Sequence, residues 1–152
     1  MDKIVINGGK PLQGEVTISG AKNAAVALVA ATILCDEPCV LENVPEISDI
    51  TACMKILEAM GAEIKLLRKN VVQFDTRNIK SPHVPYEMAR TMRASTYFLG
   101  TLLGRFHEAY VPMPGGCYLG DRHIDQHLKA FRTLGATDEL VNGEVHCSAD
   151  SR

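Results

Sequence analysis

The sequence has 152 residues, of which 46% are hydrophobic and 22% charged, a balance typical of one globular domain with a sizeable core. Its net charge of −2 gives no overall attraction to nucleic acid or anionic membranes, so an anion site has to be a local cluster of cations. No apolar run approaches the roughly 18 residues that cross a bilayer, and the N-terminus begins a strand-like run, not a signal peptide. Five cysteines without the spacing of a disulfide framework predict free thiols and a cytoplasmic location.

The first half of the chain alternates predicted strands with predicted helices. The run 21–34 is almost wholly apolar and rich in alanine, which indicates a buried helix, and its only charge and amide, Lys22 and Asn23, fall in the first turn. Ser48 and Asp49 are expected to cap the second helix, which Gly61 ends. The predicted elements are strands at 3–6, 14–19 and 37–43, helices at 21–34 and 48–60, and a hairpin of 63–67 and 71–75 with Lys69-Asn70 at its turn.

The second half follows a linker, 79–85, that contains two prolines. One long helix is predicted from 86 to 104, then a strand at 108–113, and then a helix at 121–134. That last helix is expected to direct Ile124, Leu128, Phe131 and Leu134 inward. The final hairpin joins 137–141 to 144–148 over Asn142-Gly143, a type I′ turn signal.

The two halves repeat one another. Residues 54–62 (MKILEAMGA) match 128–136 (LKAFRTLGA) at an offset of 74, whereas the apolar helices align at 71, with Lys22 over Arg93. The second unit therefore carries three extra residues between its strand and its second helix. Repeats of this size indicate stacked copies of one supersecondary unit with a shared core. We expect an α/β (α+β) fold of about two βαβαββ units, near 20–78 and 86–150.

The insertion is the glycine-rich loop 114–122 (PGGCYLGDR), which holds Cys117 and Arg122. Glycines allow a close approach to a ligand, and a nearby arginine and helix N-terminus lower the pKa of a thiol. The alternative is a glycine-rich turn with an incidental cysteine. Function concentrates in loops on a rigid scaffold, so the position of the insertion favours the reactive thiol.

Three cations, Lys22, Arg93 and Arg122, each fall at a predicted helix start or in this loop, where they suit a ligand with several phosphates. A solvent-facing lysine at a helix end is the alternative for Lys22. Metal binding is the weaker interpretation of Cys35-x3-Cys39, which lacks a second pair, and of the i, i+4 pair His123 and His127. The other cysteines on apolar faces, Cys35, Cys53 and Cys147, are expected to fill the core.

Taken together, these motifs resemble the UDP-N-acetylglucosamine enolpyruvyl transferase (1-carboxyvinyltransferase) family, which shares its fold with the enolpyruvyl transferase of the shikimate pathway (EPSP synthase). The resemblance runs through almost the whole chain. The residues that carry it are 20–25 (GAKNAA), 91–95 (TMRAS), 114–117 (PGGC), Gly120-x-Arg122 and 124–128 (IDQHL).

The resemblance implies transfer of enolpyruvyl from phosphoenolpyruvate to the 3′-hydroxyl of UDP-N-acetylglucosamine with release of phosphate, the first committed step of peptidoglycan synthesis, with no cofactor and no metal. Cys117 matches the cysteine that acts as general acid and is alkylated by fosfomycin, and Lys22 and Arg122 join it as catalytic candidates. The substrate-binding positions implied are Lys22, Asn23, Arg93, Arg122, His123, Ile124, Asp125 and Gln126.

The chain departs from the family pattern at Tyr118, Leu119, Asp121 and His123. Family members are more than twice as long and place their site between two domains, so the chain resembles an N-terminal portion whose partner is the C-terminal part of the same enzyme. Residues 1–19 then correspond to strands that pack with the second domain, and 20–152 to an incomplete first domain. A non-catalytic UDP-sugar-binding or assembly module is the alternative function, because the general base lies outside the sequence.

Overall fold

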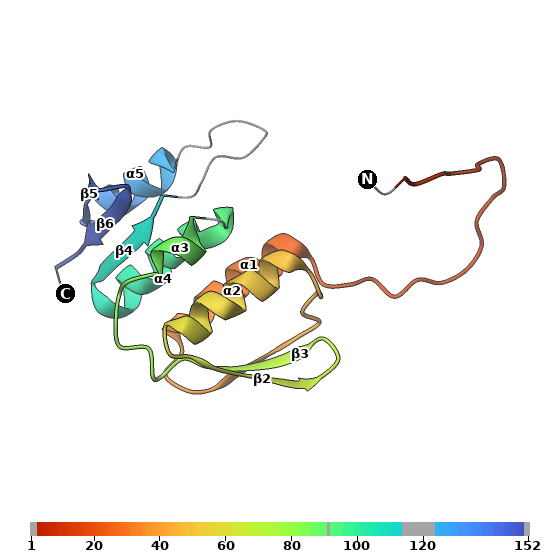
Figure 1. Ribbon diagram of the computed structural model, residues 1–152, viewed down its shortest axis with the longest axis horizontal. Helices are drawn as coiled ribbons and strands as arrows, with labels where there is room; N and C mark the ends of the chain where they lie inside the picture. Colours follow the sequence, from red (N-terminus) through yellow and green to blue (C-terminus); the bar gives the residue numbers. More distant parts are fainter. Residues whose placement is uncertain (1–2, 91, 114–123, 151–152) are drawn as a thin grey trace.

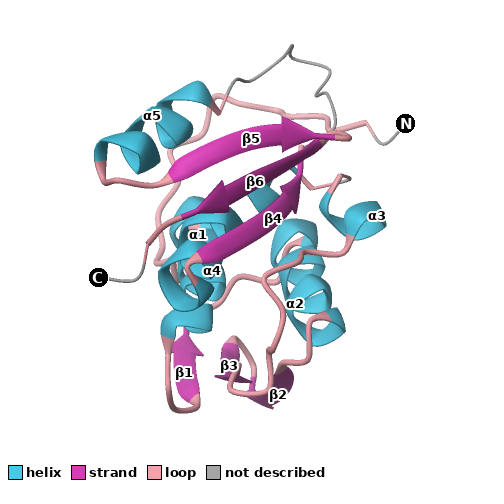
Figure 2. Cartoon of the chain, turned by 90° about the vertical axis from the view of Figure 1, so that its left-hand side faces the viewer, coloured by secondary structure: helices cyan, strands magenta, loops and turns pink. Residues whose placement is uncertain are grey.

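The computed structural model describes residues 3–90, 92–113 and 124–150, and for Arg93 it describes the backbone only. Two small antiparallel sheets lie at opposite ends of the folded body, and helices α1, α2 and α4 lie between them (Figures 1 and 2). Residues 3–20 extend away from this body as an arm (Figure 1). Within the described ranges, no helix is both long and apolar enough to cross a bilayer.

The first unit contains two helices and three strands. Its turns follow the sequence closely, because Asn70 takes a left-handed conformation (φ 59°) in the hairpin and Gly61 (φ 109°) ends the second helix. Its elements are α1 (Lys22–Ala31), the 3-10 turn η1 (Thr32–Leu34), β1 (Cys39–Glu42), α2 (Ser48–Ala59), β2 (Glu63–Arg68) and β3 (Val71–Asp75).

The second unit repeats this order, with an additional short helix before it. Asn142 (φ 53°) and Gly143 (φ 81°) both have positive φ, as the predicted type I′ turn requires. Its elements are α3 (Tyr86–Ala89), the 3-10 turn η2 (Arg93–Thr96), α4 (Tyr97–Phe106), β4 (Glu108–Pro112), α5 (Asp125–Thr133), β5 (Thr137–Val141) and β6 (Glu144–Ser148).

The two sheets have the same strand order, β1-β3-β2 and β4-β6-β5, with every neighbouring pair antiparallel. The predicted repeat is therefore confirmed in three dimensions. One difference lies at the outer edge. Residue His83 forms a parallel bridge with Tyr110 of β4, so a short segment at 82–84 extends the second sheet.

One hydrophobic core joins the units, and an arginine of the second unit forms hydrogen bonds to the first. Arg105, near the end of α4, donates from Nη1 to the carbonyl oxygens of Ile33 (2.8 Å) and Thr76 (3.0 Å), which both belong to the first unit. The largest fully buried side chains come from both units: Phe74, Phe98, Ile33, Ile50, Ile56, Leu57, Ile79, Leu99 and Leu102.

The predicted strands at 3–6 and 14–19 are wrong for this structure, because the arm has no neighbouring strand to pair with. The long helix predicted from 86 to 104 is also wrong. Met92 is extended (φ −121°, ψ 118°) and buried, with its sulfur 3.7 Å from Sγ of Cys53, so core packing of this side chain breaks the helix in two.

Two smaller expectations also fail. Leu134 is 84% exposed because it follows the end of α5, where Gly135 turns the chain (φ 95°), so the helical spacing no longer applies. Ser48 and Asp49 do not cap α2; the capping position is Ile47, and no side chain caps it. The predicted start of the last helix at Asp121 lies outside the described residues, and α5 begins at Asp125.

Candidate functional site

The first turn of α1 carries the predicted cation, Lys22, with a partly exposed side chain. Lys22 is the first residue of the helix, and Ala21 before it offers no side-chain cap, so the first N–H groups of this helix have no partner from a capping side chain. Nζ of Lys22 lies 2.6 Å from Oδ2 of Asp49, and the two side chains are 56% and 33% exposed. The structure thus places Lys22 in a partly open ion pair, beside the exposed Asn23.

Asp49 is the site residue that the sequence reasoning missed. It stands in the first turn of α2, where an acidic residue is normally explained by the helix dipole alone. Its carboxylate also pairs with the ammonium of Lys22. Each ammonium has three hydrogens to donate, so pairing with Asp49 leaves two directions open to an anionic ligand.

One face of α2 contacts both Lys22 and the residue before η2. Asp49 contacts Lys22, and one turn later Cys53 contacts Met92, the residue immediately before Arg93. Arg93 opens η2 after an extended residue, as Lys22 opens α1 after the extended Ala21. The backbone therefore confirms that both cations begin helical segments at equivalent places in the two units.

The loop that the sequence singles out lies between β4 and α5. Cys117, Arg122 and His123 fall outside the described residues, so whether they join Lys22 stays a prediction. On the near side of α5, Ile124 is buried, whereas Asp125 and Gln126 are exposed in the first turn. Nε2 of Gln126 donates to Oδ2 of Asp125 at 3.1 Å.

Three of the cysteines in the described part of the chain are poor candidates for a thiolate nucleophile. Burial raises the pKa of Cys53 to about 12, with a smaller contribution from Asp49, and raises that of Cys147 to about 11. Cys39 is also raised to about 11, first by burial and then by the neighbouring thiol of Cys35. Within the described ranges, no three His, Cys, Asp or Glu side chains gather in a way that could hold a metal ion.

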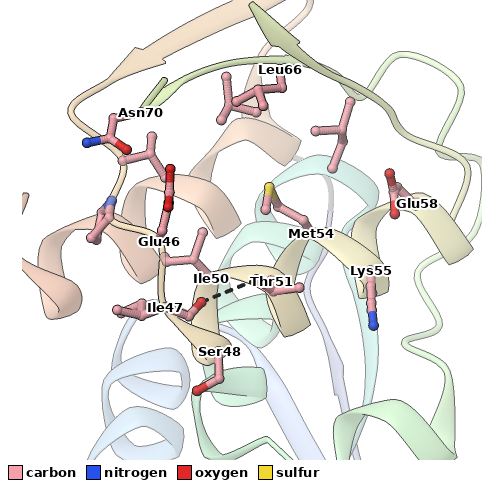
Figure 3. Close-up of a pocket in the computed structure, with 14 residues that line it drawn as sticks. Glu46, Ile47, Ser48, Ile50, Thr51, Met54, Lys55, Glu58, Leu66 and Asn70 are labelled. Carbon is pink, nitrogen blue, oxygen red and sulfur yellow. Dashed lines mark hydrogen bonds between the residues drawn. The ribbon is translucent and has the colours of Figure 1, made fainter. Parts of the chain in front are cut away.

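One sizeable cavity lies away from the predicted site. It has a volume of about 600 Å³ and lies between α2 and the first sheet, where Ile50, Met54 and Leu66 give it an apolar wall (Figure 3). Neither Lys22 nor Asn23 lines it. The cavity is lined by one cation, Lys55, and two carboxylates, Glu46 and Glu58. We attribute the site to the starts of α1 and η2 because cations begin both segments, and cavity size alone carries no chemistry.

Comparison with known proteins identifies the fold. The family described as EPSP synthase (3-phosphoshikimate 1-carboxyvinyltransferase) matches residues 6–151. The chain belongs to this family.

Relatives within the EPSP synthase family include enzymes named UDP-N-acetylglucosamine 1-carboxyvinyltransferase. The one from Coxiella burnetii (strain Dugway 5J108-111) is 45% identical over 152 residues, and the one from Streptococcus pneumoniae serotype 2 (strain D39 / NCTC 7466) is 52% identical over 149 residues. These alignments cover 100% and 98% of the chain but 35% of each relative. The chain thus spans about a third of the length of these curated relatives.

Solved structures give the same fold. The enolpyruvyl transferase NikO from Streptomyces tendae superposes with a TM-score of 0.71 at 26% identity, covering 94% of this chain and 31% of that one. An EPSP synthase from Acinetobacter baumannii superposes with a TM-score of 0.55 at 14% identity over 90% of this chain and 32% of that one, a likeness of fold alone. The expected EPSP synthase-like fold is confirmed.

Proposed function

We propose that this chain is part of an enzyme that transfers enolpyruvyl from phosphoenolpyruvate to the 3′-hydroxyl of UDP-N-acetylglucosamine and releases phosphate. The observation that carries the proposal is the 45–52% identity, along essentially the whole chain, to relatives named for this carboxyvinyl transfer. The remainder of the enzyme is the partner of this chain, and residues 1–19 pack against its second domain. The reaction needs no cofactor or metal. It belongs to peptidoglycan synthesis in the cytoplasm, and through the cell wall to cell shape and division.

The ion pair at α1 supports an anion-binding role for this helix end. Lys22 and the uncapped N–H groups offer positive charge to a phosphate or carboxylate of phosphoenolpyruvate, and Asn23 beside it offers an amide to the sugar. Asp49 holds the ammonium at 2.6 Å, so the cation is positioned before the ligand arrives. A cation fixed in this way offsets the charge that develops as the phosphate leaves.

Cys117 is the proposed general acid that protonates the methylene carbon of phosphoenolpyruvate. That step needs an acid whose pKa lies near the working pH. Burial raises the thiol pKa values of Cys53 and Cys147 well above that range, so the glycine-rich loop with Arg122 is the better place for this chemistry. Arg93, Arg122, His123, Ile124, Asp125 and Gln126 are the proposed contacts to the nucleotide sugar.

The test is phosphate release by the full-length protein that contains this chain. Release that requires both phosphoenolpyruvate and UDP-N-acetylglucosamine supports the proposal. Binding of the UDP-sugar by calorimetry without any turnover would instead identify a non-catalytic binding module. A second readout is the intact mass after incubation with fosfomycin: a single adduct is expected, and the Cys117→Ser variant, checked for folding, serves as its control.

A further inference from the structure

Two partly exposed cysteines lie at the two ends of the turn between η1 and β1. Cys35 follows the last residue of η1, and Cys39 is the first residue of β1. Both side chains are partly exposed, whereas those of Cys53 and Cys147 are buried. The residues between the pair, 36–38, are exposed and belong to no helix or strand. Two thiols are therefore close in the chain and open to small reagents at this turn.

The backbone holds both ends of the turn. Cys35 N–H donates to the carbonyl of Thr32 (3.0 Å), which closes η1. Cys39 pairs with Phe74 of β3, whose side chain is fully buried. Pro38, immediately before β1, restricts the backbone of the turn. The fold therefore sets the separation of the two cysteines, and only their side chains are left to rotate.

The two thiols are in contact. Burial raises the pKa of Cys39 to about 11, and the neighbouring Cys35 thiol adds to this through its charge and through a hydrogen bond between the two side chains. A disulfide needs Cβ atoms about 3.5–4.5 Å apart, and side chains that share a hydrogen bond through sulfur lie near this separation. Among the described residues, no third metal ligand joins the pair, so a disulfide suits it better than a metal ion.

We propose that Cys35 and Cys39 form a reversible intramolecular disulfide, with a low-molecular-weight disulfide as the oxidant. The thiolate of Cys35 attacks one sulfur of the oxidant, and the other sulfur leaves as a thiolate. The thiolate of Cys39 then attacks the Cys35 sulfur of this mixed disulfide and releases the second small thiolate. The two protons of the protein thiols pass to the two released thiolates. The protein is thus oxidised by two electrons, and the small disulfide is reduced to two thiols.

The raised pKa of Cys39 explains this order of attack. A thiol with a pKa of about 11 carries little thiolate at neutral pH, so Cys39 is a poor residue to start the exchange. Once Cys35 is bonded to the oxidant, it can no longer carry a negative charge or share its hydrogen with Cys39. Two of the causes that raise the Cys39 pKa then disappear, and its thiolate forms more easily beside the sulfur that it attacks.

The disulfide does not rest on the proposed catalytic function. Lys22 begins α1, whereas Cys35 follows η1, at the other end of the same helical segment. The contact joins two residues four positions apart in the chain, so it needs no other part of a longer protein. In a cytoplasm, where small thiols keep most cysteines reduced, such a disulfide is transient and responds to the balance of small thiol and small disulfide.

Peptide mapping of the full-length protein that contains this chain tests the disulfide. The protein is equilibrated with reduced and oxidised glutathione, and free thiols are then blocked with N-ethylmaleimide. Cleavage before each aspartate places Cys35 in the peptide 2–35 and Cys39 in the peptide 36–48. At a fixed concentration of reduced glutathione, the two peptides should become linked at an oxidised glutathione concentration at least about tenfold lower in the folded protein than in urea, because the fold holds the thiols together.

Matched variants separate this pair from the other thiols. Cys35→Ser and Cys39→Ser should each abolish the link. Cys53→Ala, checked for folding, should leave it unchanged, because the Cys53 thiol is buried and its peptide, 49–74, is released separately. Three outcomes would overturn the proposal. They are a mixed disulfide that persists on Cys35 while maleimide still blocks Cys39, linked peptides that join two protein molecules, and linkage that is no easier in the folded protein than in urea.

Discussion

The two units of this protein share one plan and differ in how completely they are built. Both have the strand order first, third, second, and in both a cation begins an equivalent helical segment, α1 in the first unit and η2 in the second. The second unit has a parallel segment at its sheet edge, and Leu99 of its helix α4 is buried. The first has no such segment among the described residues, and Leu28, the counterpart of Leu99 on α1, is half exposed.

The connection between strand and second helix also differs. Five residues, 43–47, join β1 to α2, whereas twelve, 113–124, join β4 to α5. A longer connection on a repeated scaffold is where a new function is most easily added, since it leaves the core of the unit unchanged. Duplication thus explains the fold, and the departures from duplication indicate the site.

The largest effect is expected from the longer connection of the second unit. In the full-length enzyme, Cys117→Ala should lower kcat/KM on the order of 10²–10⁴-fold, because it removes the proposed general acid. Steady-state phosphate release measures the loss. Cys53→Ala serves as control, since the Cys53 thiol is fully buried beside Met92 and should matter to stability alone. Equal activity losses in the two variants would refute the role of Cys117.

Leu99 and Leu28 test the difference in burial at equivalent positions. Leu99→Ala should lower the free energy of unfolding by about 2–5 kcal/mol, because its side chain is fully buried and its removal leaves a cavity. Leu28→Ala should cost less than about 1 kcal/mol, because that side chain is half exposed. Urea unfolding measures both. A large cost at Leu28 would show that another part of the protein covers this side chain in solution.

Arg105 tests whether the units unfold together. Arg105→Ala removes charged hydrogen bonds to the carbonyls of Ile33 and Thr76, with an expected cost of about 1.5–3 kcal/mol. Loss of this contact between the units should also broaden the urea transition, if each unit then unfolds by itself. Arg105→Lys keeps the charge but cannot reach both carbonyls. Its free energy of unfolding should lie between those of the unaltered chain and the alanine variant. An unchanged midpoint of urea unfolding in the alanine variant would show that these hydrogen bonds do not stabilise the contact between the units.

The ion pair of the first unit should affect activity more than stability. In the full-length enzyme, Asp49→Asn should lower kcat/KM by about tenfold, because it releases Lys22 from its fixed position. Its effect on the free energy of unfolding should stay below about 1 kcal/mol, as for other exposed pairs. The double variant with Lys22→Met should be no slower than Lys22→Met alone. Additive losses would show that Asp49 acts on its own and does not position Lys22.

Local chemistry explains what the sequence could predict. The turns at Asn70 and Asn142-Gly143 depend on residues that adopt positive φ, so both hairpins are confirmed. The break at Met92 depends on a contact with Cys53, which lies 39 positions earlier in the chain, and no local pattern reports it. In the same way, Lys22 was placed correctly at a helix start, whereas its partner Asp49 comes from another helix and has an ordinary local explanation.

The smallest expected effect concerns an ion pair at the end of the hairpin in the first unit. Nη2 of Arg77 lies 2.6 Å from Oδ2 of Asp75, and this hydrogen bond holds the pKa of Asp75 at about 2, below its ordinary value of 3.8. A lowered pKa means that the folded state favours the ionised carboxylate. Its contribution to stability is therefore complete above pH 3.8 and is lost as the pH falls toward 2.

Asp75→Asn should melt slightly below the unaltered chain at pH 6, and this difference in melting temperature, the gap, should narrow by pH 3. Arg77→Gln breaks the same ion pair and should lower the melting temperature at pH 6 by a similar amount. The double variant should therefore melt no lower than either single variant. A gap that stays constant with pH would mean that Asp75 acts through its shape in the turn and that its charge is immaterial.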